Sequence, residues 1–232
     1  MDTIRVSGQE INTELVRKNV RRLRIRVMPS GSLHILAPHS MPIAEIARFL
    51  HDKKNWIIAS IEEYKRHPRR SPPTIEQGAK ILFQGRELEL HIFEGQKKNA
   101  LERTDECFFL HVKNNVRDVR GEFRRQYRRL ASKLLSRRTW ELAHQYGLSY
   151  NKLSIKDTRS RWGSCSSANN INLNWRLVLA PAEIMDYVIV HELTHLDELN
   201  HTKRFWDLVQ LRDPNYRLHR KWLHAHAPRL EL

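Results

Sequence analysis

The sequence is short of cysteine, glycine and long apolar runs, and each shortage excludes a class of protein. Two cysteines among 232 residues, Cys107 and Cys165, cannot make the disulfide framework of a small secreted protein. Eight glycines and nine prolines exclude collagen-like and low-complexity chains. No apolar run approaches the ~18 residues of a membrane span, and the first twenty residues lack the apolar core of a secretory signal. We therefore expect a cytoplasmic protein with no membrane partner.

Acidic residues are also scarce, since 26 Asp and Glu stand against 41 Lys and Arg and leave a net charge of +15. Such an excess attracts polyanions and supports weak, non-specific nucleic-acid binding through phosphate contacts. Many of the arginines follow one predicted helix, from Val119 to a stop at Gly147. They are Arg120, Arg124, Arg125, Arg128, Arg129, Arg137 and Arg138. We favour a solvated helix face over a nucleic-acid groove as their interpretation.

Hydrophobic periodicity divides the chain into a β-rich N-terminal part, residues 1–115, and a C-terminal part, residues 116–232. In the first part, alternation over 22–27 and the turn residues Pro29, Ser30 and Gly31 predict a hairpin. Helices are expected at 42–50 and 51–64, and the proline-rich stretch 67–73 predicts a linker or long loop. Further strands are expected at 80–83, 86–92, 107–112, 152–156 and 171–179.

The motif His191-Glu192-Leu193-Thr194-His195 lies on a predicted helix that starts near Pro181. Two residues four apart on a helix are rotated by only ~40° and lie ~6 Å apart along the axis, so both imidazoles can reach one ion. Glu192 directly follows the first histidine, which places its carboxylate beside a metal-bound water. Zn²⁺ lowers the pKa of that water toward ~7, and the carboxylate can take its proton. The strongly apolar turn before the motif disfavours a chance match on an exposed helix.

A third histidine, His201, follows six residues after the motif. Asn200 can end the helix, because asparagine accepts a left-handed turn, and the chain can then present His201 to the same ion. Glu198 competes for this place, but on a straight helix it lies ~10 Å along the axis from His191, too far to share an ion. A helix break after the motif would rescue it. We favour His201, and expect Glu198 or Asp197 to orient an imidazole.

Four segments carry a family resemblance: residues 161–165, 171–177, 186–195 and 200–206. Through them the sequence resembles the YgjP-like metallopeptidase family, predicted metal-dependent hydrolases related to the SprT-like and WLM zincins. The resemblance implies an α+β protein whose β-rich N-terminal part precedes a zincin-like metallopeptidase core containing the HExxH helix. It also implies a peptide or protein substrate. The implied zinc ligands are His191, His195 and His201, with Glu192 as the general base.

Other residues are weaker candidates. The segment from Arg161 to Cys165 predicts either a strand beside the cleft, where an extended peptide could pair, or a core hairpin packed by Trp162. Arg161, Tyr216 and His219 are candidates for stabilising the transition state. Two rival hypotheses use the positive charge. One is a nucleic-acid-associated module with structural zinc, and the other is a protease acting on DNA-bound proteins.

Overall fold

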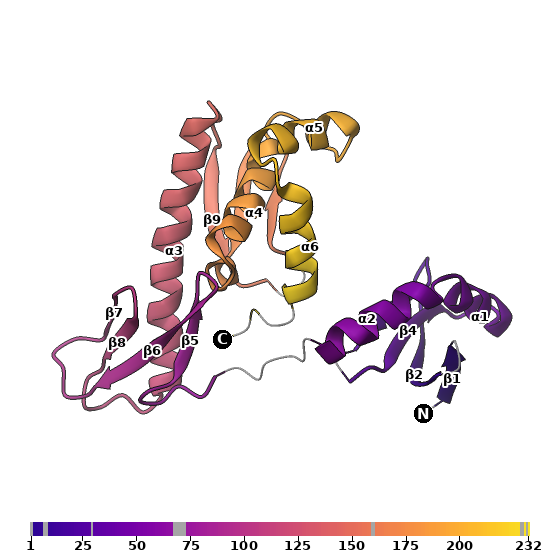
Figure 1. Cartoon of the computed structure of the whole chain (residues 1–232), viewed down its shortest axis with the longest axis horizontal. Coiled ribbons are helices and arrows are strands. Elements are labelled where there is room, and N and C mark those ends of the chain that lie inside the picture. Colours follow the sequence, from indigo (N-terminus) through magenta and orange to yellow (C-terminus); the bar gives the residue numbers. More distant parts are fainter. Residues whose placement is uncertain are drawn as a thin grey trace. The chain divides into compact units, whose positions relative to one another are not determined.

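The mixed α+β chain has two separate hydrophobic cores (Figure 1). This computed structural model describes residues 2–6, 9–28, 30–66, 73–158, 161–227, 230 and 232. Each core belongs to one compact unit, Met1–Arg69 or Arg70–Leu232. The expected boundary between residues 115 and 116 does not coincide with this division. The strands between residues 80 and 111 share the core of the later helices, because their buried side chains pack against them.

The first unit is a four-stranded sheet with two helices. Its strands are β1 (Asp2–Val6), β2 (Gln9–Lys18), β3 (Arg24–Val27) and β4 (Leu33–Pro38), in the order β1-β2-β4-β3. The expected hairpin is present as the antiparallel pair β3 and β4, turning at Gly31 with φ of 81°. The expected helices are present as α1 (Ile43–Asp52) and α2 (Lys54–Arg66). Pro29 and residues 67–72 of the expected linker lie outside the described residues.

The second unit begins with strands β5 (Lys80–Phe83), β6 (Arg86–Phe93), β7 (Ala100–Arg103) and β8 (Cys107–His111), ordered β5-β6-β8-β7. The turn from β5 to β6 ties this sheet to the later part of the unit. Its residues Gln84 and Gly85 both have positive φ, and their N–H groups donate to the carbonyls of Val178 and Leu179. A Cβ on Gly85 would lie 2.8 Å from the Pro181 side chain, so only glycine fits this approach.

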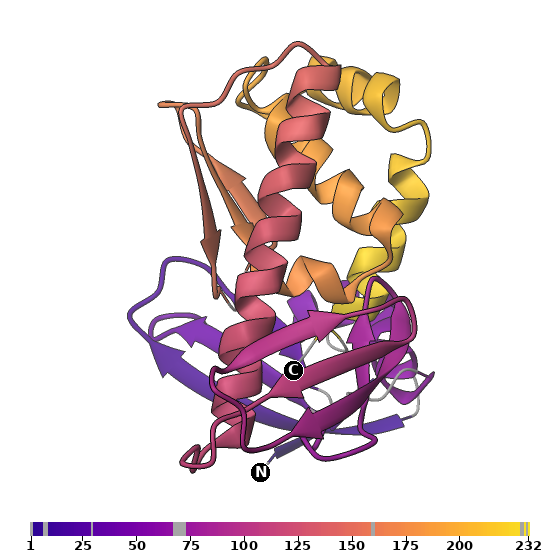
Figure 2. The ribbon, with the colours of Figure 1, turned by 90° about the vertical axis from the view of Figure 1, so that its left-hand side faces the viewer.

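Helix α3 (Val119–Gln145) runs alongside both sheets of the second unit (Figures 1 and 2). Asp118 begins it by accepting a hydrogen bond from the N–H of Gly121, and Gly147, with φ of 65°, lies just past its end as expected. The buried stripe Phe123, Tyr127, Ala131 and Leu135 repeats every four residues, which places it on one face.

The metal-site region follows α3. A three-stranded sheet, ordered β10-β11-β9, contains β9 (Lys152–Lys156), β10 (Gly163–Cys165) and β11 (Asn170–Asn174). The expected strand over 171–179 is wrong beyond Asn174, because the Asn174 carboxamide accepts from the Arg176 N–H and begins a 3₁₀ helix, η1 (Trp175–Leu179). Helices α4 (Ala182–Thr194), α5 (Lys203–Arg212) and α6 (Tyr216–His226) complete the unit. No helix in the described part of the chain is both long and apolar enough to cross a membrane.

Replacing Tyr127 by phenylalanine tests how α3 is attached to β5. The fully buried Tyr127 hydroxyl donates to the Leu82 carbonyl at 2.7 Å, and its loss leaves that oxygen unpaired. We expect the free energy of unfolding to fall by about 1–2 kcal/mol, measured by urea denaturation with circular dichroism. Tyr150→Phe is the control, because the Tyr150 hydroxyl has no hydrogen bond within the described residues. Equal effects of the two substitutions would contradict this account.

Candidate active site

Helix α4 carries polar groups into the core of the second unit. It is apolar on nearly every side, with Ile184, Val188 and Ile189 buried, as expected for a helix enclosed by other elements. Its last turn contains His191 and Glu192, and Glu192 is only 6% exposed. The first half of the HExxH motif is therefore positioned by a rigid, buried helix.

The chain leaves the helical path earlier than the sequence analysis expected. Helix α4 ends at Thr194 with His195 as its C-terminal cap, instead of continuing to Asn200. Helix α5 then begins where the Thr202 hydroxyl accepts a hydrogen bond from the N–H of Phe205 at 3.3 Å. The short segment between the two helices turns the chain back, and it brings His201 to the end of α4.

The three histidines meet at one point. Their ring centroids lie 5.1 Å apart for His191 and His195, 5.0 Å for His191 and His201, and 4.8 Å for His195 and His201. The Nε2 atoms of His191 and His201 are 3.0 Å apart, and one candidate ligand atom from each ring lies within 4.8 Å of the others. Two nitrogens on one tetrahedral Zn²⁺ are separated by about 3.3 Å, given bonds of about 2.0 Å. The described residues contain no second cluster of three such side chains.

Other contacts leave ring nitrogens of this cluster free for a metal. The Nδ1 atom of His195 lies 3.1 Å from the Glu198 carbonyl oxygen, which leaves Nε2 of that ring facing the other histidines. The buried Nδ1 of His191 has no hydrogen-bond partner among the described residues. Glu198 therefore contacts an imidazole as expected, but through its main chain. Asp197 instead pairs with Arg212, which also donates to the Thr194 hydroxyl.

The electrostatics favour uncharged imidazoles beside a carboxyl group. Burial, together with the charges of His195, His201 and Arg220, lowers the pKa of His191 to about 3, and burial also lowers the pKa of His201. Neutral imidazole is the form that binds metal ions. Burial raises the pKa of Glu192 to about 8, and the positive charge of Arg161 partly opposes this shift. The carboxyl group is thus shifted toward the range of a general acid or base at neutral pH.

Aromatic side chains of α5 form the support of the cluster. The Phe205 ring stacks on His195 at 4.5 Å and meets His201 edge-on at 4.7 Å. Trp206 stacks on His201 at 5.6 Å between centroids. Phe205 and Trp206 thus pack against the ligand rings, and these contacts hold the rings in fixed orientations.

Strand β10 lies against α4 at a glycine that the sequence analysis did not single out. A Cβ on Gly163 would lie 2.5 Å from both Cγ and Oε1 of Glu192. No side chain fits there while Glu192 keeps its position. The only sequence signal is a glycine between Trp162 and Ser164 in a strand-like stretch, where glycine marks a close approach of another group.

A cavity of about 580 Å³ opens beside the cluster. Trp162 lines it, whereas Arg161 and Tyr216 do not. Arg161 lines a smaller cavity, which Trp162 also lines. Tyr216 is buried, stacks on Trp206 at 5.5 Å, and accepts a hydrogen bond from Arg217. Several other lining residues were not predicted from the sequence, namely Tyr187, Arg220, Leu223, His224 and Ala227.

Comparison with protein families agrees with this architecture. The YgjP-like metallopeptidase domain matches residues 21–226. The chain belongs to the YgjP-like family. It is accordingly a metal-dependent hydrolase of the metallopeptidase type. No curated protein matches the chain. The crystal structure of the metallopeptidase zymogen of Pyrococcus abyssi abylysin is similar over 42% of this chain and 99% of that chain, with 17% identity. Its TM-score of 0.37 carries no argument about the site.

Gly163→Ala tests the close approach of β10 to Glu192. The new methyl group must displace the Glu192 side chain, because the three atoms nearest to it all belong to that side chain. We expect at least a tenfold loss of casein hydrolysis with unchanged metal content, the latter measured by inductively coupled plasma mass spectrometry. Ser164→Ala, on the same strand, is the control and should keep near wild-type activity. Full activity of Gly163→Ala would show that Glu192 does not need its observed position.

Proposed function

We propose that the chain is a zinc-dependent peptidase in which His191, His195 and His201 hold the metal and Glu192 is the general base. The observation that carries this proposal is the convergence of three histidine rings beside one buried carboxyl group. The low pKa of His191 and the 3.0 Å distance between the Nε2 atoms of His191 and His201 fit metal-binding imidazoles. Zn²⁺ in such a site polarises a carbonyl group and lowers the pKa of water.

Zinc in a catalytic role suits the number of donors. Structural zinc normally has four protein ligands, whereas catalytic zinc keeps one position open. Within the described residues the cluster contains three candidate ligands, all imidazoles. This count supports a hydrolase over the rival hypothesis of a nucleic-acid-associated module with structural zinc.

In the proposed reaction, the Glu192 carboxylate accepts a proton from the attacking water and returns it to the leaving amine. Burial raises its pKa, and a bound divalent cation would lower it again, which suits both steps. Strand β10 is an edge strand among the described residues, in the order β10-β11-β9, so an extended peptide can pair with its outer main chain. Trp162, which directly precedes β10, then contacts the substrate side chains in the cavity.

We propose Arg220, in place of Arg161 or Tyr216, as the charge that stabilises the developing oxyanion. Its guanidinium lies over the Trp206 ring at 4.9 Å, and it lines the cavity together with His191 and His201. It makes no ion pair with the described residues, so its charge is not neutralised by a neighbouring carboxylate. A fixed positive charge beside the reacting carbonyl is most effective in a site that excludes water.

The peptide substrate and the cell compartment are further parts of this proposal. Both cysteines are free, which fits a reducing cytoplasmic setting. A protease acting on DNA-bound proteins is the second candidate function. The arginines on α3 favour it, since they line a separate cavity in the same unit.

Glu192→Gln and His201→Ala separate catalysis from metal binding. We expect Glu192→Gln to keep one zinc per chain and to lose about 10²- to 10⁴-fold in casein hydrolysis, because it removes proton transfer alone. His201→Ala should lose zinc as well. Glu198→Gln is the control, because it leaves the carbonyl that contacts His195 intact and should keep both zinc and activity. Stoichiometric zinc in His201→Ala would refute the three-histidine assignment.

Arg220→Gln tests oxyanion stabilisation. We expect kcat to fall about 10²-fold, with KM and zinc content nearly unchanged, because the charge acts in the transition state. Arg217→Gln, three residues earlier on α6, is the matched control and should leave kcat close to wild type. An equal fall of kcat in both variants would mean that positive charge in general causes the loss, and it would contradict the proposed role of Arg220.

A further inference from the structure

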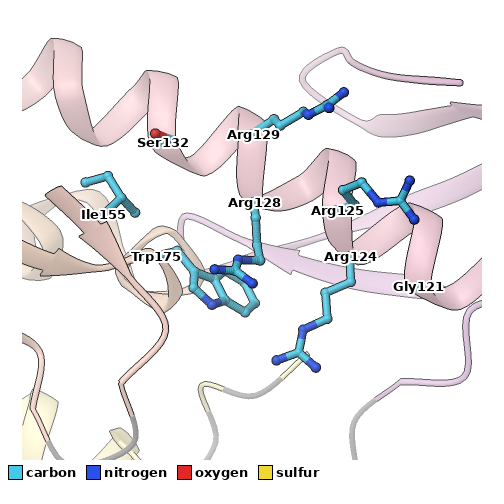
Figure 3. A pocket seen from close by; sticks show the side chains of 8 residues that line it. All are labelled: Gly121, Arg124, Arg125, Arg128, Arg129, Ser132, Ile155 and Trp175. Atoms are coloured by element: carbon cyan, nitrogen blue, oxygen red, sulfur yellow. The ribbon is translucent and has the colours of Figure 1, made fainter.

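A second cavity of the same unit is lined by arginines and lies apart from the histidine cluster. It measures about 460 Å³ and lies between α3, β9 and η1 (Figure 3). The α3 residues that line it recur every three or four positions, which places them on one face of the helix. Ile155 and Trp175 form the opposite wall. The α3 residues are Gly121, Arg124, Arg125, Arg128, Arg129 and Ser132.

The four arginines of α3 that line the cavity extend in two directions. Arg124 and Arg128 extend from α3 toward Trp175, whereas Arg125 and Arg129 extend away from it (Figure 3). The Trp175 ring is fully buried and lies beneath guanidinium groups, 4.8 Å from that of Arg176 and 5.9 Å from that of Arg124. An aromatic ring holds the guanidinium groups that stack on it in one orientation, so that their N–H donors point outward.

Positive charge in the cavity exceeds the negative charge available to balance it. Arg124, Arg128 and Arg176 share a single carboxylate, that of Asp157. Burial raises the pKa of Asp157, but the hydrogen bonds from Arg176 and Trp175 and the charges of Arg176 and Arg124 together outweigh this effect. They hold its pKa below the usual value, so Asp157 is ionised.

The two remaining arginines add to the excess. Arg125 pairs with the buried Glu122 at 2.9 Å, and Arg129 makes no ion pair within the described part of the chain. Of the five guanidinium groups in the cluster, four therefore share two carboxylates, and that of Arg129 pairs with none in the described part of the chain.

We propose that this cavity, which we call the α3 arginine pocket, binds the phosphates of a nucleic-acid backbone. Guanidinium groups on successive helical turns repeat about every 5.4 Å, which suits a regularly charged polymer better than a single small anion. Guanidinium also forms bidentate hydrogen bonds with phosphate oxygens. The site uses none of the residues assigned to hydrolysis, so it does not depend on the proposed catalytic function.

The test compares two double variants that lose the same charge. Arg128→Gln with Arg129→Gln removes two pocket arginines and keeps the Asp157 pairs of Arg124 and Arg176. Lys80→Gln with Arg137→Gln removes two exposed charges of the same unit outside the pocket. Binding of a fluorescein-labelled single-stranded oligonucleotide is followed by fluorescence anisotropy across a salt series. Single Arg129→Gln serves as a milder variant, because Arg129 holds no ion pair whose loss could unfold the protein.

We expect the pocket double variant to bind at least tenfold more weakly than wild type at low salt. Its log–log salt slope should be reduced by about 0.7 for each lost phosphate contact. Arg129→Gln should show about half of that change in slope, and the control double variant should stay within threefold of wild type. Glu192→Gln should bind as wild type does, which separates this result from any failure of the catalytic proposal.

Three results would overturn the assignment. Equal weakening in the control double variant would mean that binding depends on overall charge. Competition by inorganic phosphate at the concentration of oligonucleotide phosphate would indicate a small-anion site. Equal competition by polyglutamate at matched charge would indicate an acidic protein partner instead.

Discussion

The structure depends on placing three polar side chains, those of His191, Glu192 and His195, in an apolar core at the end of α4. Burying an ionisable group is costly unless it is neutral, paired or bound to a metal. Here burial lowers the pKa of His191 and raises that of Glu192, so both groups are shifted toward their uncharged forms. The surrounding fold supports this arrangement, since Phe205 holds the rings from below and Gly163 leaves room for the carboxyl group. Such polar groups at the buried end of a helix are the observation on which the proposed metal centre rests.

Much of this could be predicted from local patterns. The HExxH spacing, the apolar helix before it and the segments of the YgjP-like resemblance all concern residues close in sequence, and the family and the α+β fold class are confirmed. The long helix α3 was also visible, because its buried side chains recur every four residues. Where a pattern permits two structures, the prediction was wrong. The apolar run after Asn174 suits a strand, but a single carboxamide hydrogen bond turns it into a 3₁₀ helix.

Contacts between distant segments could not be predicted. Gly163 and Glu192 are 29 positions apart in the numbering, and only the packing of β10 on α4 shows that a side chain at Gly163 would collide. Arg220 lies on α6, whose many basic residues are typical of a solvated helix, yet its side chain lines the cavity beside the histidines. The division of the chain was missed for the same reason. Alternating strands look alike in sequence, and nothing local shows that β5–β8 share their core with α3 and α4.

The most direct test of the metal centre is X-ray absorption spectroscopy at the zinc edge on zinc-loaded protein. The account predicts a first shell of three imidazole nitrogens at about 2.0–2.1 Å and one further light atom from water. The outer-shell scattering of imidazole rings should fit three histidines. A sulfur scatterer at about 2.3 Å, or a fit that requires four protein ligands, would contradict it.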